Sequence, residues 1–110
     1  MGKFVITKRK NGQYQFNLIA KNGKVILTSE GYITKINCQR GVDSVKINSF
    51  DDAKYEHKTA TNGNCYFNLK AKNGEIIGTS EMYLSKASCN KGILSVKTNA
   101  SRAVIKDESD

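Results

Sequence analysis

The sequence has 110 residues, 38% hydrophobic and 25% charged, which is the composition of one compact folded domain and excludes disordered, collagen-like and coiled-coil proteins. No apolar run approaches the roughly 20 residues of a membrane helix, and the first residues do not form a signal peptide, so we expect a cytoplasmic protein with no membrane partner. Eighteen Lys and Arg against 10 Asp and Glu give a net charge of +8, which indicates either an anionic partner or a dispersed, solvated basic surface.

The chain begins with a predicted three-stranded antiparallel meander. Apolar and polar side chains alternate over residues 4–7 and again over 14–20, as in strands with one buried face. The pair Asn11-Gly12 between these runs is a strong hairpin signal, because Asn and Gly tolerate the positive φ angles of the tightest turns. The pair Asn22-Gly23 repeats this signal before a third strand, Val25–Thr28.

A helix is predicted to follow the third strand. Its apolar face is marked by Cys38, Gly41, Val42 and Val45, which recur at the spacing i, i+3, i+4 and i+7. Thr34 precedes this run and is the expected N-cap, because its hydroxyl can accept from a first-turn amide. A glycine inside a helix costs about 1 kcal/mol relative to Ala, so we expect close packing that leaves no room for a Cβ at Gly41.

The second half of the chain repeats the first. A shift of 51 residues aligns residues 11–48 with 62–99 without a gap, so the second half predicts its own meander and a helix capped by Ser85. We place the first repeat at residues 1–53 and the second at 54–110. A unit of about fifty residues buries only a marginal core, so the two repeats are expected to share one.

One further strand is predicted after each helix, over residues 54–59 and 103–106. Because residues 54–59 also serve as the first strand of the second meander, the total is seven strands and two helices. The expected fold class is α+β, with tandem β(3)-α-β repeats forming one mostly antiparallel sheet and both helices on one face. We expect a monomer with an internal pseudo-two-fold axis.

Several motifs occur in each repeat: Asn-Gly, Phe-Asn-Leu-x-Ala, Thr-Ser-Glu-x-Tyr, and Gly-Val/Ile-x-Ser-Val-Lys-x-Asn, the last as residues 92–99 of the second repeat. This combination resembles the YegP-like family of small bacterial proteins over nearly the whole chain. The resemblance implies that the two repeats exchange their C-terminal strands, here residues 54–59 and 103–106. It implies no catalytic residue, ligand or established activity.

The residue types argue against an enzyme. Three cysteines, Cys38, Cys65 and Cys89, are odd in number and too widely spaced for a disulfide framework or a zinc site. His57 is the one histidine, which leaves no partner for a histidine metal site or for a Ser-His or Cys-His pair. It aligns with the core position Ile6, so we expect a half-buried structural residue. No catalytic residue, metal or cofactor is predicted.

One polar set could suggest catalysis, because Ser, Tyr and Lys occur together in several active sites. It consists of Ser29, Glu30, Tyr32 and Lys35, repeated as Ser80, Glu81, Tyr83 and Lys86. Spacing alone establishes no base within hydrogen-bond reach. We favour a structural role, with the serine and glutamate tying the turn, the tyrosine packing beside the helix and the lysine in solvent.

A candidate anion site is predicted from the basic and polar residues of the strands and turns. Asn17 and Asn68 alternate with core residues, so they should face away from the helices. Lysines flank the second turn of each repeat, and an exposed tyrosine could stack a base. The predicted site for single-stranded nucleic acid or another anionic partner comprises Lys21, Lys24, Tyr66, Asn68, Lys70 and Lys72. An ordinary solvated sheet face is the alternative.

Three classes of function remain open, and an enzyme is the least favoured of them. The first is a non-catalytic binding module whose basic surface meets an anionic partner, either nucleic acid or an acidic protein. The second is a structural module that pairs with itself or with another chain through sheet edges. Salt dependence separates the first two, because phosphate contacts release counterions and strand pairing does not.

Overall fold

The computed structural model describes residues 2–110, and its elements occur in the predicted order. The strands and helices are β1 (Lys3–Lys8), β2 (Tyr14–Ile19), β3 (Val25–Thr28), α1 (Lys35–Asn48), β4 (Tyr55–Thr59), β5 (Cys65–Lys70), β6 (Ile76–Thr79), α2 (Lys86–Ala100) and β7 (Val104–Asp107). A short 3-10 helix, Asp52–Lys54, leads into β4. Within residues 2–110 no helix is long and apolar enough to cross a bilayer.

All strands of the described residues form one sheet in the order β4-β5-β6-β3-β2-β1-β7. The central strands β3 and β6 are antiparallel and meet at Thr28 and Thr79, which are aligned residues of the two repeats. A pseudo-two-fold axis therefore passes between them. Every neighbouring pair is antiparallel except β1 and β7, which are parallel. The predicted α+β fold class is confirmed.

Both helices pack on one face of this sheet and bridge the two repeats. Helix α1 contacts β2 of its own repeat and β5 and β6 of the other, and α2 contacts β5 and β3. One core results, formed by strand residues such as Phe16 and Phe67 and by helix residues such as Val42 and Val96. The N-caps are Thr34 and Ser85, as predicted.

The sheet departs from simple alternation beside the second turn of each repeat. Leu18 pairs with Leu27 and Ile19 with Val25, so Ile26 is an extra, bulged residue of β3. A bulge changes the direction of the local side chains. Ile26 accordingly joins the core together with Leu27, although strict alternation would place these neighbours on opposite faces.

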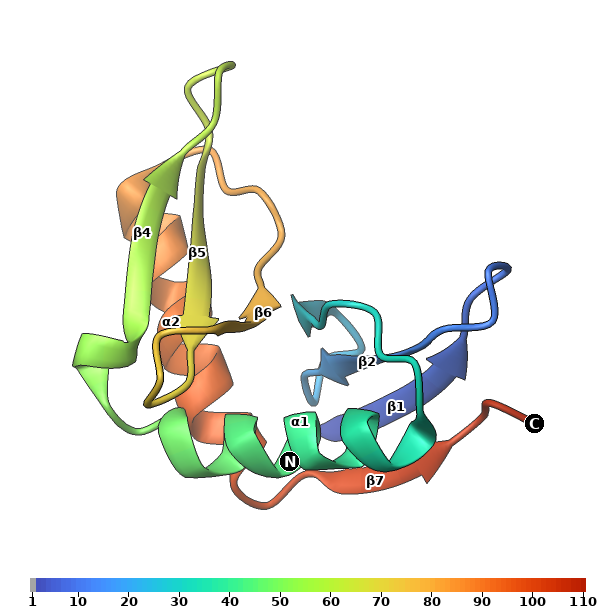
Figure 1. Cartoon of the computed structure of the whole chain (residues 1–110). Coiled ribbons are helices and arrows are strands. Elements are labelled where there is room, and N and C mark those ends of the chain that lie inside the picture. The colour runs from blue at the N-terminus through green and yellow to red at the C-terminus, as the bar shows by residue number, and fades with distance from the viewer. Residues whose placement is uncertain (1) are drawn as a thin grey trace.

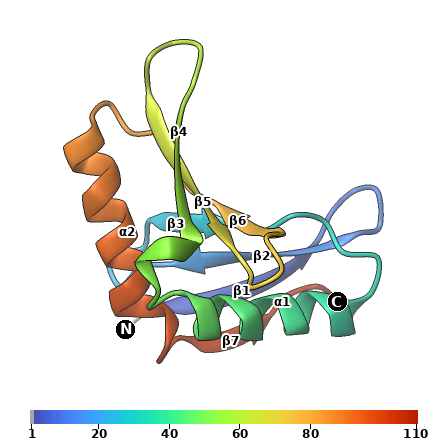
Figure 2. The same cartoon turned by 60° about the vertical axis from the view of Figure 1, so that its left-hand side comes forward.

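The two halves of the sheet project in different directions from the central pair. Figure 1 shows the β4–β5 hairpin and the β1–β2 hairpin as separate arms, with β7 along β1. In the turned view of Figure 2, neither helix enters the space between the arms, and no strand lies outside β4.

The strands that follow the two helices are not equivalent, because β7 joins the half of the sheet that belongs to the first repeat, whereas β4 pairs within the second repeat. β4 pairs antiparallel with β5 and holds the place in the second repeat that β1 holds in the first. β7 lies parallel to β1 on its outer side. Our expectation that residues 54–59 and 103–106 are counterparts is wrong, because the 51-residue repeat leaves too little chain after α1 for both a returning strand and a new first strand.

Candidate functional site

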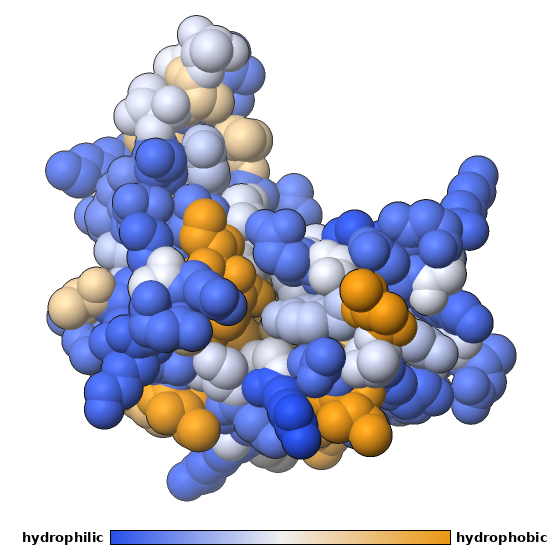
Figure 3. Space-filling model, viewed as in Figure 1, coloured by the Kyte–Doolittle hydropathy of each residue, from blue (hydrophilic) through white to orange (hydrophobic). Residues whose placement is uncertain are grey.

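The six residues of the predicted anion site lie at three separate places. Lys21 and Lys24 flank the β2–β3 turn, which lies beside α2. Lys72 lies at the β5–β6 turn, and because β3 and β6 are antiparallel, the two turns are at opposite ends of the central strands (Figure 2). Only Tyr66, Asn68 and Lys70 share a strand. Figure 3 shows hydrophilic residues spread over the face in view rather than gathered in one patch.

The polar side chains of β5 are engaged with their neighbours. Asn68 is only 5% exposed, and its side-chain oxygen accepts from the Thr79 hydroxyl at 2.8 Å. Lys70 Nζ lies 3.1 Å from Glu56 Oε2, and the hydrogen bond from Lys70 lowers the pKa of that carboxyl. The charge of Lys70 is therefore largely balanced within the sheet, and the amide of Asn68 is not free for a ligand.

The repeated Ser-Glu-Tyr-Lys set is structural, but its lysine differs from our expectation. Ser29 Oγ accepts from the Phe16 amide at 2.9 Å and so ties the turn to β2. The Tyr32 ring stacks on Phe16, and burial raises the pKa of the tyrosine hydroxyl. Lys35 is not free in solvent, because its Nζ lies 2.9 Å from Asp107 Oδ2 on β7.

The outer edge of β4 is open where the equivalent edge of β1 is covered. On β1, the carbonyl of Ile6 accepts from the Glu108 amide at 2.8 Å, and Ile6 is fully buried. His57 occupies the aligned position on β4 and is exposed. Our expectation that His57 is half-buried is wrong, because no strand of residues 2–110 lies beyond β4.

The pairing of β5 determines which backbone groups of β4 face outward. The carbonyl of Phe67 accepts from Ser80 on the side away from β4. Successive strand residues direct their backbone groups to alternate sides, so the next residue, Asn68, bonds to β4, where its partner is Glu56. The N–H and C=O groups of His57 therefore point to the open edge.

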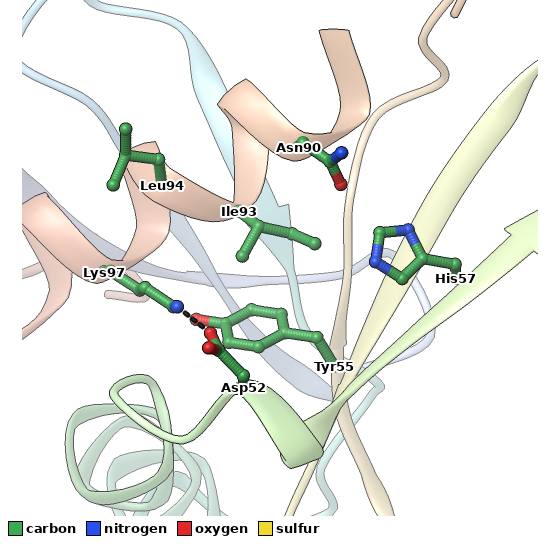
Figure 4. Close-up of a pocket in the computed structure, with 7 residues that line it drawn as sticks. All are labelled: Asp52, Tyr55, His57, Asn90, Ile93, Leu94 and Lys97. Carbon is green, nitrogen blue, oxygen red and sulfur yellow. Dashed lines mark hydrogen bonds and ion pairs between the residues drawn. The ribbon is translucent and has the colours of Figure 1, made fainter. Parts of the chain in front are cut away.

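A hollow of about 360 Å³ lies beside this edge, between β4 and α2 (Figure 4). Leu94 is 62% exposed there, at a position where the first repeat has Asp43. Lys97 pairs with Asp52 and lies 5.8 Å from the centroid of the Tyr55 ring, at one end of the hollow. The lining residues are Asp52, Tyr55, His57, Asn90, Ile93, Leu94 and Lys97.

Two of the polar side chains that line the hollow already have partners within the protein. The Tyr55 hydroxyl donates to the carbonyl of Ser49 at 2.7 Å, and burial raises its pKa, so it stays protonated. The ammonium of Lys97 is occupied by Asp52. The edge therefore offers an unpaired backbone next to a recess that is lined by both apolar and polar side chains.

Nucleophilic thiols and metal ligands are not assembled either. Cys38 and Cys89 are buried free thiols, and burial raises the pKa of both, that of Cys38 to about 11. A thiol with a raised pKa is a poor nucleophile at neutral pH. Within residues 2–110 no group of three or more His, Cys, Asp or Glu side chains could hold a metal ion.

A comparison with known families identifies both repeats. The profile described as "Domain of unknown function (DUF1508)" matches residues 10–56 and again residues 60–107. The chain belongs to the DUF1508 family. The two DUF1508 matches cover both helices and strands β2, β3, β5, β6 and β7.

Relatives of this DUF1508 protein match it over nearly their whole length. The UPF0339 protein ACIAD0721 of Acinetobacter baylyi is 51% identical over 106 residues, 96% of each chain. The UPF0339 protein YegP of Escherichia coli is 46% identical over 108 residues, 98% of each chain. The solution NMR structure of E. coli yegP, described as a protein of unknown function, has a TM-score of 0.94 and covers 98% of this chain and 93% of that chain. The predicted resemblance to the YegP-like family is confirmed.

The β4 edge is the feature that sequence reasoning missed. The sequence nevertheless indicated this edge, because at two aligned positions one repeat has an apolar residue and the other has a polar one. Ile6 aligns with His57, and Asp43 aligns with Leu94. In the structure His57 and Leu94 both line the hollow. These two sequence differences therefore mark the place where β7 covers the first repeat and no strand of the described residues covers the second.

Proposed function

We propose that the protein is a non-catalytic interaction module that binds an extended segment of another polypeptide as an added strand on the outer edge of β4. The observation that carries this proposal is the difference between two equivalent edges. β1 is extended by β7, whereas β4 directs the backbone of His57 to solvent beside the hollow. Strand addition derives affinity from main-chain hydrogen bonds and specificity from adjoining pockets.

A basic surface for nucleic acid is the second candidate, supported by the net charge of +8. The geometry favours it less than strand addition. Lys21 and Lys72 lie at opposite ends of the central strands, and Lys70 is paired with Glu56. A single strand stacked on Tyr66 could follow β5 toward Lys72, but Lys21 and Lys24 lie at the other turn.

Selection from a displayed library of random ten-residue peptides on the immobilised full chain tests strand addition. We expect enriched peptides that, when synthesised, slow amide hydrogen exchange at His57 and Thr59, because a new strand would bond to outward-facing groups of β4. The same peptides should leave exchange at the β5–β6 turn unchanged.

The variant His57→Pro supplies the matched control. Its N–H does not bond to β5, and proline is tolerated on an edge strand where the N–H faces solvent, so the fold should persist. The selected peptides should lose binding to this variant. Peptides that bind wild type and His57→Pro equally, or a selection that enriches none, would contradict the proposed function.

A further inference from the structure

The second repeat lacks a strand that the first repeat possesses, and the first repeat shows the geometry of that strand. We infer that the partner segment accepted by β4 is acidic at its C-terminal end, runs parallel to β4 and places a carboxylate beside Lys86. This inference rests on the proposed function and adds the direction, register and charge of the bound segment.

The direction and register come from β7. In the first repeat β7 runs parallel to β1, with Ile105 opposite Phe4 and Asp107 opposite Ile6. A shift of 51 residues carries Phe4 onto Tyr55 and Ile6 onto His57. A strand bound to β4 in the same way would place its counterpart of Ile105 opposite Tyr55 and its counterpart of Asp107 opposite His57.

The charge comes from the lysine at the start of each helix. Lys35 Nζ lies 2.9 Å from Asp107 Oδ2 and 3.3 Å from Asp110 Oδ1 of the docked tail. Lys86 is the aligned residue of α2, is exposed, and takes part in none of the ion pairs within residues 2–110. A carboxylate on the bound strand would give Lys86 the partner that Lys35 already has.

The other end of the hollow disfavours the opposite direction. Asp52 lies there, and its side chain is largely exposed although it pairs with Lys97. An antiparallel segment would bring its acidic end toward this carboxylate and away from Lys86. Like charges in proximity are repulsive, so the parallel direction is favoured on electrostatic grounds as well.

The residues that line the hollow favour an apolar side chain at one position of the bound segment. The residue opposite Tyr55 would lie near Ile93 and Leu94 of α2, and Leu94 is 62% exposed. Covering apolar surface contributes roughly 25 cal/mol per Å². An isoleucine or similar side chain at this position of the segment, with an acid two residues later, is therefore the expected pattern.

A second copy of the chain is a poorer occupant than a segment of a different protein. The β7 segment of a second copy has the expected apolar and acidic residues, but it is already paired with β1 of that copy. Moving it to the β4 edge of another copy would leave that β1 edge unpaired. This transfer gains no net strand pairing, which leaves a foreign acidic segment as the occupant.

The probe for this inference is a labelled peptide with the sequence of residues 101–110, SRAVIKDESD, added to the full chain. Fluorescence anisotropy gives affinity, and amide exchange gives location. We expect protection at Tyr55 and His57 of β4, the residues that align with Phe4 and Ile6 opposite β7, with no change at Ile6 of β1. Protection at Ile6 instead would mean that the peptide merely replaces the protein's own tail, and would overturn the inference.

Matched variants test charge and direction. Lys86→Glu should weaken peptide binding by about tenfold or more, whereas Lys91→Glu, the same charge change at an exposed α2 position outside the hollow, should change it by less than about twofold. A peptide with Asn in place of Asp107, and a peptide of reversed order, should each bind about tenfold more weakly than the original.

The outcomes separate the inference from the proposed function. One set of results would overturn the inference and leave the proposed function standing: acidic, neutral and reversed peptides bind alike, Lys86→Glu has no effect, and His57→Pro abolishes binding. In that case β4 accepts strands regardless of their charge and direction. If no peptide protects His57 and His57→Pro changes nothing, the proposed function fails as well.

Discussion

Gly41 and Gly92 show how a single missing side chain positions a helix. A Cβ at Gly41 would overlap the Tyr32 hydroxyl, and one at Gly92 would overlap the Tyr83 hydroxyl. The close approach predicted from the sequence is confirmed. The neighbour is a tyrosine of the preceding loop in each repeat, in addition to the sheet.

We predict that Gly41→Ala destabilises the protein by about 1 to 3 kcal/mol, because overpacking outweighs the gain of about 1 kcal/mol in helix propensity. Thermal or urea unfolding measures the loss. The loss should shrink in a Tyr32→Phe background, where the first atom met by the new Cβ is absent. A Gly41→Ala variant as stable as wild type would contradict close packing at this position.

Asp107 holds the tail through charge and hydrogen bonds. Its carboxylate accepts from the side chain and backbone of Ser109 and pairs with Lys35. The hydrogen bond from the Ser109 hydroxyl, together with the weaker effect of Lys35, lowers the pKa of Asp107 from 3.8 to about 2.

This lowered pKa predicts acid sensitivity of the tail. Because the folded pKa lies below the unfolded one, ionised Asp107 stabilises the docked tail above about pH 4, and this contribution is lost as the pH falls toward 2. The Ser109 amide should report the titration by NMR, with a midpoint well below 3.8. The Asp107→Asn variant should lack this transition, and a wild-type midpoint near 3.8 would count against the Ser109 hydrogen bond and the Lys35 contact.

At the scale of elements, β4 and β7 both come directly after a helix, yet they pair in opposite senses. β4 is antiparallel to β5 and β7 is parallel to β1. The chain after α1 serves as the first strand of the second repeat, whereas the chain after α2 lies outside the first strand of the first repeat. The same local sequence pattern thus produces two kinds of strand.

We predict that deletion of residues 101–110 weakens the first repeat although it removes chain from the second. β1 would lose its parallel neighbour, so the amides of β1 that face β7 should exchange faster, and the thermal midpoint should fall. Amides of β4 and β5 should keep their relative protection. Unchanged exchange in β1 would rule out a stabilising role for the exchanged strand.

Elements that depend on neighbouring residues were predictable, and those that depend on distant ones were not. The Asn-Gly turns, the N-caps Thr34 and Ser85 and the apolar helix faces are confirmed, because each is specified within a few residues. The partners of β4 and β7 were not, because strand pairing depends on which edge a connection can reach. The six candidate lysine, tyrosine and asparagine residues failed to assemble for the same reason.

At the scale of the molecule, the positive charge is distributed over separate surfaces around a shared core. Lys21 and Lys72 are aligned residues of the two repeats, but the pseudo-two-fold axis places them at opposite ends of the central strands. Symmetry therefore disperses aligned charges that lie far from the axis. Only residues near the axis, such as Thr28 and Thr79, are brought together by it.

We predict weak, sequence-independent binding of a single-stranded oligonucleotide at low salt. A dispersed basic surface should give a shallow log-log salt slope, since each contacted phosphate contributes about −0.7. Because Lys70 is paired with Glu56, Lys70→Ala and Tyr66→Ala should leave affinity nearly unchanged in anisotropy measurements. A large loss in either variant would restore the β5 face as a nucleic-acid site.

The sequence by itself determined the repeat, the elements within each repeat, the capping residues and the family, because these depend on local periodicity and on aligned motifs. Only the tertiary structure decided which edge is open. The two repeats are similar in sequence, but the described residues supply one returning strand for two equivalent edges. β7 covers β1, and the exposed backbone of His57 on β4 is the consequence.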